Sequence, residues 1–453
     1  MIPMTIGEIL KAVNGTWCGD SAVLNRYPER FATDSRDVKE NSLFIAFRGA
    51  KTDGHRYIPN ALASGACAVL CEEEKEGEPR IVVPDVLSAL QEAAGYYRNT
   101  RSYPFIGVTG SVGKTTAKEM IYSVLSAHGP VFKTPGSLNG QIGIPLAMLS
   151  LPQQVDAAVI EMGISLPGEM RRIGRIVHPD IGIFMNIADA HLEALKTREG
   201  ILREKCEMLS YSKGHTVIIN GDDELLSAHD FGCRTVSFGL NPACDVWAEP
   251  PAAEGGATAQ STVLHCGERS VAVTIPAYGT YMVYAALAAA AAGFLLGLSD
   301  EEIRSGIACY ETVGHRSRVI ALKNGMTLID DCYNANPSSN RAAIDSMMAL
   351  PGRKVCLLGD MREMGERSPQ LHKELGAYAE QRGVDIICTQ GAEAQAIGEG
   401  VSQIPCMHFE TKTDMLESLK ELLQPGDVIL VKASHGAAFE DVTNGILAMY
   451  SYL

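Results

Sequence analysis

The chain has 453 residues, with 54 Asp and Glu against 39 Lys and Arg, which gives a formal net charge of −15. At about 100–200 residues per domain, this length predicts two to four domains, with three as the central estimate. Hydrophobic residues make up 46% and charged residues 21%, which is typical of a globular protein and excludes a disordered one. The acidic balance argues against broad binding to nucleic acid or to an anionic membrane, because both need a basic surface. This charge balance does not exclude a local basic pocket that binds phosphate.

Cysteine spacing and the apolar segments indicate the cellular compartment in which the protein functions. The 12 cysteines are scattered and none forms Cys-x-x-Cys, so we expect reduced thiols rather than a zinc ribbon or a disulfide scaffold. The first residues lack a basic stretch followed by an apolar run, so we expect no signal peptide and a soluble, cytoplasmic protein. The uncharged stretch 281–298 approaches the length of a membrane span. It is rich in alanine and lacks basic flanks, so we predict a buried core helix instead.

Apolar runs taken in chain order predict an α/β fold in three domains, over residues 1–102, 103–313 and 314–453. The second and third domains alternate continuous apolar runs with helical segments, the pattern of doubly wound parallel sheets. A tyrosine-bearing stretch at 96–104 marks the first boundary, and a Pro-, Gly- and Ala-rich stretch at 241–256 predicts a β excursion rich in loops. The runs that predict strands are 42–47, 66–70, 105–108, 157–160, 181–185, 216–219, 327–329, 354–358, 385–388 and 428–431. The clearest predicted helices are 58–64, 117–128 and 368–381, and the acidic run 72–78 predicts a loop.

The strongest motif is the segment from Gly107 to Thr116, GVTGSVGKTT, which follows a predicted strand and opens a predicted helix. Backbone N–H groups of such a loop surround a phosphate, Lys114 adds a positive charge, and the hydroxyl of Thr115 suits Mg²⁺. The general pattern Gly-x-x-x-x-Gly-Lys-[Ser/Thr] is not met, because Val108 replaces its first glycine. A chance Gly-Lys-Thr turn is the alternative, and the flanking strand and helix argue against it.

Three further polar residues follow in the same domain. Glu161 ends a predicted strand, His191 lies just past the next strand, and Lys205 lies on a helix. Each has a simpler interpretation: a helix cap, a loop residue and a surface charge, respectively. Because ligands bind at the carboxyl edge of parallel sheets, the three together with the phosphate loop predict a magnesium site that holds a phosphate during transfer.

In these residues the chain resembles the ATP-dependent Mur ligases of bacterial cell-wall synthesis, over nearly all 453 positions. The third domain most resembles the members that add D-alanyl-D-alanine, because it contains the Asp-x-Tyr-Asn-Ala-Asn-Pro run that ends at Pro337. The Asp-Asn-Pro-Arg motif of the diaminopimelate-adding members is absent from the sequence. The other matching segments are 33–36, 43–49, 53–55, 134–146 and 358–365 with His372.

The resemblance implies an ATP- and Mg²⁺-dependent amide ligase, expected as a monomer. It would join UDP-N-acetylmuramoyl-tripeptide to D-alanyl-D-alanine through an acyl phosphate. The three domains would be a small uridine-nucleotide-binding domain, a central ATP-binding domain and a Rossmann-like ligase domain. The implied ATP-binding residues are Gly110, Ser111, Val112, Gly113, Lys114, Thr115, Thr116, Arg316 and Asp331. The implied substrate-binding residues are Ser35, Arg36, Asp53, Gly54, His55, Asn139, Gln141, Asn334, Asn336, Lys432 and Ser434. The implied metal ligands are Thr115, Glu161, His191 and Lys205 as a carbamate, and the catalytic residues are Lys114, Glu161, His191, Lys205 and Arg316.

The sequence departs from the family pattern near the Ala-rich helix. Met282 and Ala285 stand where the family has asparagines that meet the nucleotide, so adenine recognition is expected to be weaker or rebuilt. Ser137 and Gly140 likewise replace common asparagines. Two alternatives follow: a related ligase that joins other substrates, or a nucleotide-dependent scaffold protein. The retained phosphate loop and metal-ligand residues argue against the scaffold.

Overall fold

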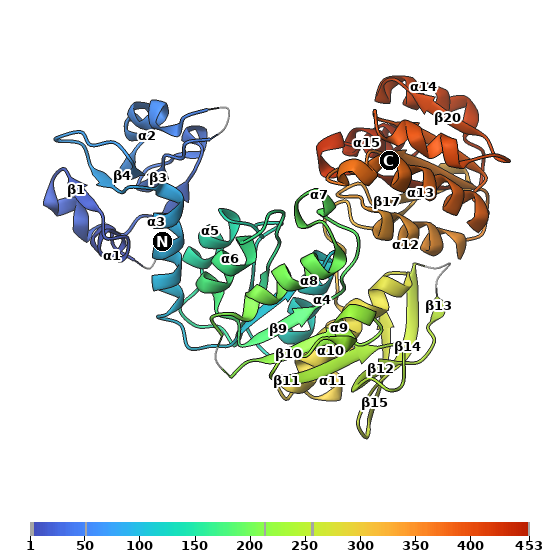
Figure 1. The fold of residues 1–453 in the computed structure, drawn as a ribbon, viewed down its shortest axis with the longest axis horizontal. Helices are drawn as coiled ribbons and strands as arrows, with labels where there is room; N and C mark the ends of the chain where they lie inside the picture. The colour runs from blue at the N-terminus through green and yellow to red at the C-terminus, as the bar shows by residue number, and fades with distance from the viewer. Residues whose placement is uncertain (1–3, 50–51, 213, 255–257, 452–453) are drawn as a thin grey trace.

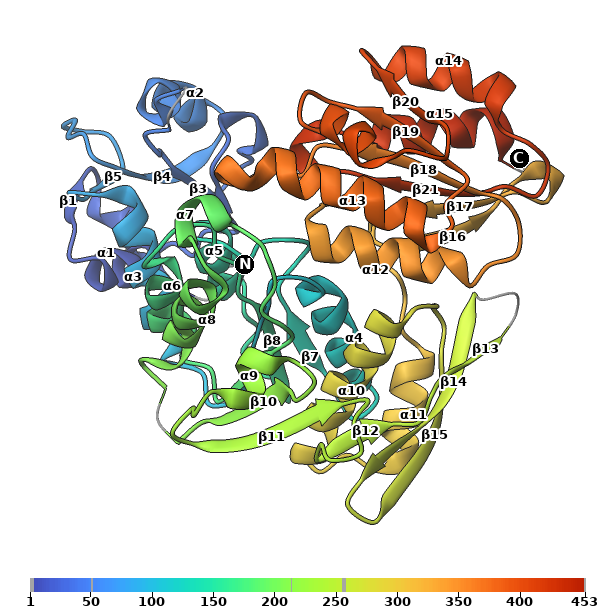
Figure 2. The same ribbon diagram turned by 45° about the vertical axis from the view of Figure 1, so that its right-hand side comes forward.

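A computed structural model describes residues 4–49, 52–212, 214–254 and 258–451 and contains three β-sheets, one in each expected domain range. In Figure 1 the amino-terminal region is blue, the central region green to yellow and the carboxy-terminal region orange to red. Figure 2 shows the carboxy-terminal region lying above the central one, with the amino-terminal region beside both. The fold class predicted from the sequence is confirmed. The exact domain bounds stay a prediction.

The amino-terminal sheet has five strands in the order β1-β5-β4-β3-β2, and every pair except β1–β5 is parallel. Helix α1 begins with a capping box, in which Thr5 and Glu8 bond to each other's backbone N–H. The strands are β1 (Thr16–Cys18), β2 (Arg30–Ala32), β3 (Ser42–Ile45), β4 (Ala66–Cys71) and β5 (Arg80–Val82). The helices are α1 (Ile6–Ala12), α2 (Ile58–Ala63) and α3 (Val86–Arg98).

Helix α3 joins the amino-terminal region to the central one. The hydroxyl of Tyr97 donates to the carbonyl of Leu151 over 2.8 Å, and Arg98 Nε donates to the carbonyl of Val177 over 2.8 Å. Tyr97 is 1% exposed. The stretch 96–104, predicted as a boundary, therefore begins inside a helix that packs on the central region. This contact accounts for Tyr97, one of the tyrosines of that stretch.

The central sheet has ten strands. The run β11-β10-β9-β6-β8-β7 is parallel, β12 extends it in parallel, and β13, β14 and β15 form an antiparallel extension. The strands are β6 (Phe105–Thr109), β7 (Val131–Lys133), β8 (Ala157–Glu161), β9 (Ile181–Phe184), β10 (Thr216–Asn220), β11 (Arg234–Gly239), β12 (Val246–Ala248), β13 (Ala252–Glu254), β14 (Ala259–Cys266) and β15 (Arg269–Ile275). The helices are α4 (Lys114–Ser126), α5 (Gly143–Leu149), α6 (Glu169–Val177), α7 (Leu192–Leu195), α8 (Arg198–Cys206), α9 (Glu224–Ala228), α10 (Thr280–Leu295) and α11 (Asp300–Ala308).

The β excursion predicted at 241–256 is present as β12 and β13, although residues 255–257 lie outside the described part. The sequence analysis missed the hairpin of β14 and β15. Its strands alternate buried and more exposed side chains around a turn at Gly267, whose φ is +56°. This period of two was a signal that could have predicted them.

Helix α10 covers most of the uncharged stretch 281–298. Its alanines from Ala285 to Ala292 are 0–1% exposed and pack in the core beside α4. The prediction of a buried core helix is confirmed. No helix in the described ranges is long and apolar enough to cross a bilayer.

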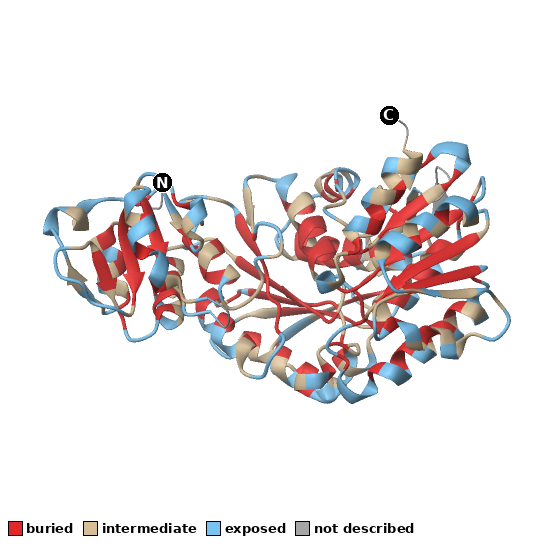
Figure 3. Ribbon diagram, turned by 90° about the horizontal axis from the view of Figure 1, so that it is seen from above, coloured by how far each residue is buried: buried red, intermediate tan, exposed pale blue. Residues whose placement is uncertain are grey.

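The carboxy-terminal sheet has six strands in the order β16-β17-β21-β18-β19-β20, parallel except for the pair β16–β17. Figure 3 shows mostly buried strands in this region, between helices that carry exposed as well as buried residues. The strands are β16 (Arg318–Ala321), β17 (Thr327–Asp330), β18 (Lys354–Gly359), β19 (Ile386–Gln390), β20 (Cys406–Phe409) and β21 (Val428–Lys432). The helices are α12 (Pro337–Met348), α13 (Ser368–Arg382), α14 (Lys412–Leu422) and α15 (Glu440–Tyr450).

Close packing between α4 and α11 gives a stability test. A Cβ added at Gly306 would lie 2.4 Å from the Cα of Val124, whereas one at Gly95 on α3 would meet nothing within 4 Å. Gly306→Ala should therefore destabilise the protein by about 1–3 kcal/mol through overpacking. Gly95→Ala, the matched control, should stabilise it by about 0.5–1 kcal/mol through helix propensity. Urea unfolding midpoints of the two variants check this, and shifts in the same direction would contradict it.

Candidate active site

The phosphate loop lies between β6 and α4, where the sequence motif predicted it. Gly113 caps α4 with φ +78°, a left-handed conformation that favours glycine. Val112 N–H donates to Asn186 Oδ1 and Asn186 Nδ2 donates back to the Val112 carbonyl, both over 3.0 Å. Ser111 Oγ donates to the carbonyl of Ala188 over 2.9 Å. The segment after β9 thus holds the loop in place.

The amine of Lys114 lies over this loop and donates to the carbonyl of Gly110 over 2.8 Å. Its enclosed position lowers the pKa of Lys114; the charge of Glu161 opposes this effect and that of Arg316 adds to it. A cation that has lost water on several sides is strongly attracted to an anion such as phosphate.

Glu161, at the end of β8, is 1% exposed and anchors the centre of the site. Its Oε2 accepts from Thr115 Oγ1 over 2.8 Å, and its Oε1 accepts from Asn139 Nδ2 over 2.7 Å. The buried amine of Lys118 lies 3.8 Å from Oε2 and donates to the carbonyls of Thr134 and Gly136. These partners satisfy a carboxylate that would otherwise be costly to bury. The oxygens of Thr115 and Glu161 are the hard ligands that Mg²⁺ prefers.

Lys205 on α8 is buried against the phosphate loop rather than exposed to solvent, and it lines neither of the two cavities between the central and carboxy-terminal regions. It is 1% exposed, and its Nζ donates to the carbonyl of Gly110 over 3.0 Å. Burial lowers the pKa of Lys205 far below its usual range, and the positive charge of Lys114 adds to this effect. The alternative that Lys205 is a surface charge is wrong.

His191 lies past β9 with φ +54° and points toward the carboxy-terminal region. Its Nδ1 lies 2.5 Å from Glu363 Oε2. The structure therefore places Lys114, Thr115, Glu161 and Lys205 around the loop. The ring of His191 pairs instead with Glu363 of the carboxy-terminal region.

Residues of the carboxy-terminal region face the loop. The guanidinium of Arg316 lies 3.8 Å from the centre of the Tyr333 ring. Asp331 accepts from Ser317 N–H over 2.9 Å and from Lys432 Nζ over 2.6 Å. Lys432, the last residue of β21, also donates through Nζ to the carbonyl of Asn334 over 2.9 Å. Ser434 Oγ donates to the carbonyl of Ala335 over 3.2 Å. Asn336 caps α12 by accepting from the N–H of Ser339.

Two cavities lie between the central and carboxy-terminal regions. The first, of about 430 Å³, is lined by the predicted residues Ser111, Val112, Gly113, Lys114, Thr115, Thr116, Asn139, Glu161, Arg316, Asp331, Asn334, Asn336 and Lys432. The second, of about 490 Å³, is lined by Ser111, Lys114, Asn139, His191, Asn334, Asn336 and Ser434 among others. Lys114 and Asn139 therefore face both cavities.

The predicted residues of the amino-terminal region line neither cavity. Arg36 pairs with Asp34 over 2.5 Å. His55 is buried, with Nδ1 2.7 Å from Asp53 and Nε2 accepting from the N–H of Glu72 over 2.9 Å. Ser35 and Gly54 lie in the same turns as these residues.

Gln141 also lies outside both cavities, in contrast to Asn139. Its carbonyl accepts from Gln91 on α3, its Oε1 accepts from Arg172, and its Nε2 donates to the carbonyl of Glu169. These contacts assign it to the joint between the amino-terminal and central regions.

Positions 282 and 285, where the family asparagines are replaced, lie in the core and line neither cavity. Met282 and Ala285 are 2% and 1% exposed and pack in the core. Tyr281 and Tyr284, on the adjacent face of α10, line the first cavity instead. The hydroxyl of Tyr284 donates to Asp222 Oδ2 over 2.9 Å. Other lining residues that the sequence analysis missed include Asn186 and Asn220; both lie at strand ends, which was an available signal.

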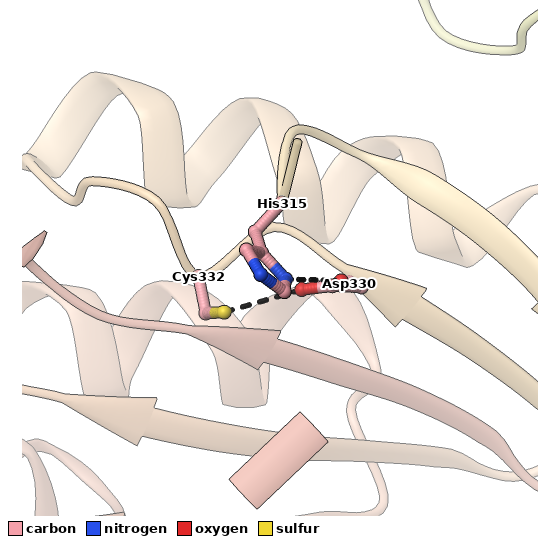
Figure 4. Close-up of side chains that lie close together, drawn as sticks. All are labelled: His315, Asp330 and Cys332. Atoms are coloured by element: carbon pink, nitrogen blue, oxygen red, sulfur yellow. Dashed lines mark hydrogen bonds and ion pairs between the residues drawn. The ribbon is translucent and has the colours of Figure 1, made fainter. Parts of the chain in front are cut away.

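A second cluster supports the segment that carries Arg316. Figure 4 shows His315 and Cys332 both directed at Asp330. His315 Nδ1 lies 2.7 Å from Asp330 Oδ2, while Cys332 Sγ and Thr443 Oγ1 both donate to Oδ1 over 3.2 Å. Burial raises the pKa of Cys332 to about 12, so its thiol stays protonated and is a poor metal ligand. The cluster fits a structural role, fixing the residue next to Arg316.

A phosphate loop facing a buried carboxylate, between two α/β sheets, defines a class of nucleotide-dependent enzymes. Three family models match the chain: "Mur ligase family, catalytic domain" at 31–98, "Mur ligase middle domain" at 108–293 and "Mur ligase, glutamate ligase domain" at 315–435. The chain belongs to the Mur ligase family.

Similar proteins include the UDP-N-acetylmuramoyl-tripeptide–D-alanyl-D-alanine ligases of Bacillus subtilis and Escherichia coli. They are 34% and 33% identical, over 99% and 98% of this chain and 99% of each relative. Among solved structures, MurF from Acinetobacter baumannii is 30% identical with a TM-score of 0.89, covering 98% of this chain and 99% of that one. MurF ligase from Thermotoga maritima in complex with ADP is 29% identical with a TM-score of 0.84, covering 92% and 96%.

The Asp330 cluster is tested by two substitutions. Asp330→Ala leaves the buried hydroxyl of Thr443 and thiol of Cys332 without their acceptor and should destabilise the protein by about 1–3 kcal/mol. Asp330→Asn keeps one accepting oxygen and should lose clearly less. Thermal or urea unfolding of both variants measures this, and equal losses would show that the hydrogen bonds contribute little.

Proposed function

We propose that this protein is an ATP-dependent amide ligase that adds D-alanyl-D-alanine to UDP-N-acetylmuramoyl-tripeptide through an acyl phosphate, in the cytoplasm and as a monomer. The observation that carries the proposal is the loop of Lys114 and Thr115, joined to Glu161 and facing Arg316 across one cavity. Relatives of this name that match over almost the whole chain support the choice of substrates.

In this proposal ATP binds with its phosphates on the loop, residues Gly110 to Thr116. Lys114 contacts the β- and γ-phosphates, and Arg316 stabilises the negative charge on the phosphoryl group in transfer. Asp331 and Lys432 complete the ATP site from the carboxy-terminal side. Mg²⁺, when bound, would reduce the repulsion between the triphosphate and the substrate carboxylate. Thr115, Glu161, His191 and carbamylated Lys205 would hold it, and the oxygens of Thr115 and Glu161 already lie together.

The reaction then has two balanced steps. An oxygen of the tripeptide carboxylate attacks the γ-phosphorus, the bond to the β–γ bridging oxygen breaks, and ADP leaves. The amine of the dipeptide attacks the acyl carbon, the acyl–phosphate bond breaks, and the amine loses a proton to solvent as the amide forms. Because acyl phosphates hydrolyse in water, a site enclosed between two regions favours the second step.

The peptide and nucleotide parts of the substrates would contact different regions. Ser35, Arg36 and the segment 53–55 would hold the uridine nucleotide in the amino-terminal region. Asn139, Asn334, Asn336 and Ser434 would position the peptide groups along the second cavity. Gln141 would support this arrangement from the joint below α3.

The function is tested by mass spectrometry of the products formed from ATP, Mg²⁺, UDP-N-acetylmuramoyl-tripeptide and D-alanyl-D-alanine. We expect the amide product, ADP and phosphate only when both substrates are present, and a loss of at least about a hundredfold in Lys114→Ala, which removes a phosphate-binding cation. Folded protein that releases phosphate with a different acceptor, or forms no amide, would contradict the proposal.

Carbamylation of Lys205 is tested separately. The neutral amine adds to CO₂, forming an N–C bond and releasing a proton. A lowered pKa keeps this amine neutral at lower pH than in an ordinary lysine. Lys205→Ala should lose most activity and regain part of it with acetate or formate, which restore an oxygen ligand. The exposed Lys420→Ala, on α14, is the control and should show no loss and no rescue. Wild-type activity in Lys205→Ala would rule out this role.

A further inference from the structure

The side chains of Arg362 and His435 in the second cavity have no role in the proposed function. Arg362 follows β18 and His435 follows β21, so both lie at the carboxyl edge of the carboxy-terminal sheet. This edge is where open α/β sheets bind ligands.

The other charged groups of this cavity already have partners. Lys114 donates to the carbonyl of Gly110, and His191 pairs with Glu363. Glu169 accepts from the N–H groups of Ser165 and Leu166. Within the described ranges, the guanidinium of Arg362 has neither an ion pair nor a hydrogen bond. Over the same ranges, the ring of His435 has only a stacking contact with Tyr333, with ring centres 5.2 Å apart.

Arg362 is exposed, and both its backbone and the end of its side chain lie against the loop after β21. Its backbone N–H donates to Ser434 Oγ over 2.9 Å. Its guanidinium lies against the backbone of Gly436, where an added Cβ would be 2.3 Å from Nη1 and 2.9 Å from Cζ. A side chain at position 436 would therefore displace the end of the guanidinium from this place. The loops after β18 and β21 thus hold an unpaired cation at the wall of the cavity.

We propose that Arg362, with His435 beside it, binds the carboxylate of the incoming dipeptide. This inference rests on the proposed function, in which the dipeptide amine must reach the acyl group near Lys114. An extended dipeptide spans about 7 Å from amine to carboxylate, so the carboxylate lies toward the far wall of the cavity. The carboxy-terminal region supplies that wall and presents a planar guanidinium, which binds carboxylates through two parallel hydrogen bonds. The nucleotide-linked substrate is expected to enter from the opposite, amino-terminal side.

The test compares two acceptors, D-alanyl-D-alanine and D-alanyl-D-alaninamide, which lacks the negative charge. In the wild type we expect KM for the amide to exceed KM for the acid by about tenfold or more, the effect of a lost charged hydrogen bond. Arg362→Met should raise KM for the acid by a similar factor and leave KM for the amide and for ATP unchanged.

Two further variants make the result specific. Gly436→Ala displaces only the flexible end of Arg362 and should shift KM for the acid in the same direction. Arg382→Met, on the exposed face of α13 where Arg382 pairs with Asp345, is the matched control and should change neither KM.

A shift that is equal for acid and amide, or that appears only in KM for the nucleotide-linked substrate, would overturn the assignment. Absence of product with either acceptor in the wild type would instead contradict the proposed function, and this inference with it. The two failures are therefore distinguishable.

Discussion

The hydrogen bond from Thr115 to Glu161 joins the first turn of α4 to the end of β8, and the rest of the site is arranged around it. A carboxylate this deeply buried needs partners on every side. Asn139 and the buried amine of Lys118 supply them, and the hydroxyl of Thr134 accepts from the backbone N–H of Glu161. These partners come from α4 and from the loop after β7, so one carboxylate fixes the start of α4, the end of β8 and that loop relative to one another.

The first cavity is a cationic centre within an acidic protein. With a net charge of −15, the chain as a whole would repel a triphosphate and a peptide carboxylate. Lys114 comes from the central region, while Arg316 and Lys432 come from the carboxy-terminal region. Neither sheet alone encloses the first cavity, so proposed catalysis depends on the two regions lying together. The contact between Asp330 and His315 holds the residue that precedes Arg316 in the chain.

The sequence predicted the strand ends and the loop well, because continuous apolar runs and the glycine-lysine-threonine turn are local signals. Glu161 and Lys205 were found for the same reason. What the sequence could not predict depends on directions that only packing decides. The loss of the family asparagines at Met282 and Ala285 predicted a weaker or rebuilt adenine site, but not that Tyr281 and Tyr284 would face the cavity while the two apolar residues pack in the core. The contacts of Gln141 with α3 depend in the same way on the packing of α3 against the central region.

In the proposed reaction, one site transfers a phosphoryl group to the tripeptide carboxylate before the amide forms. Tripeptide labelled with ¹⁸O in both oxygens of the reacting carboxylate tests this directly, by mass analysis of the phosphate released during ligation. One ¹⁸O atom in each phosphate is predicted, because the acyl–phosphate bond that breaks in the second step leaves a carboxylate oxygen on phosphorus. Phosphate free of ¹⁸O, formed together with the amide, would contradict the account.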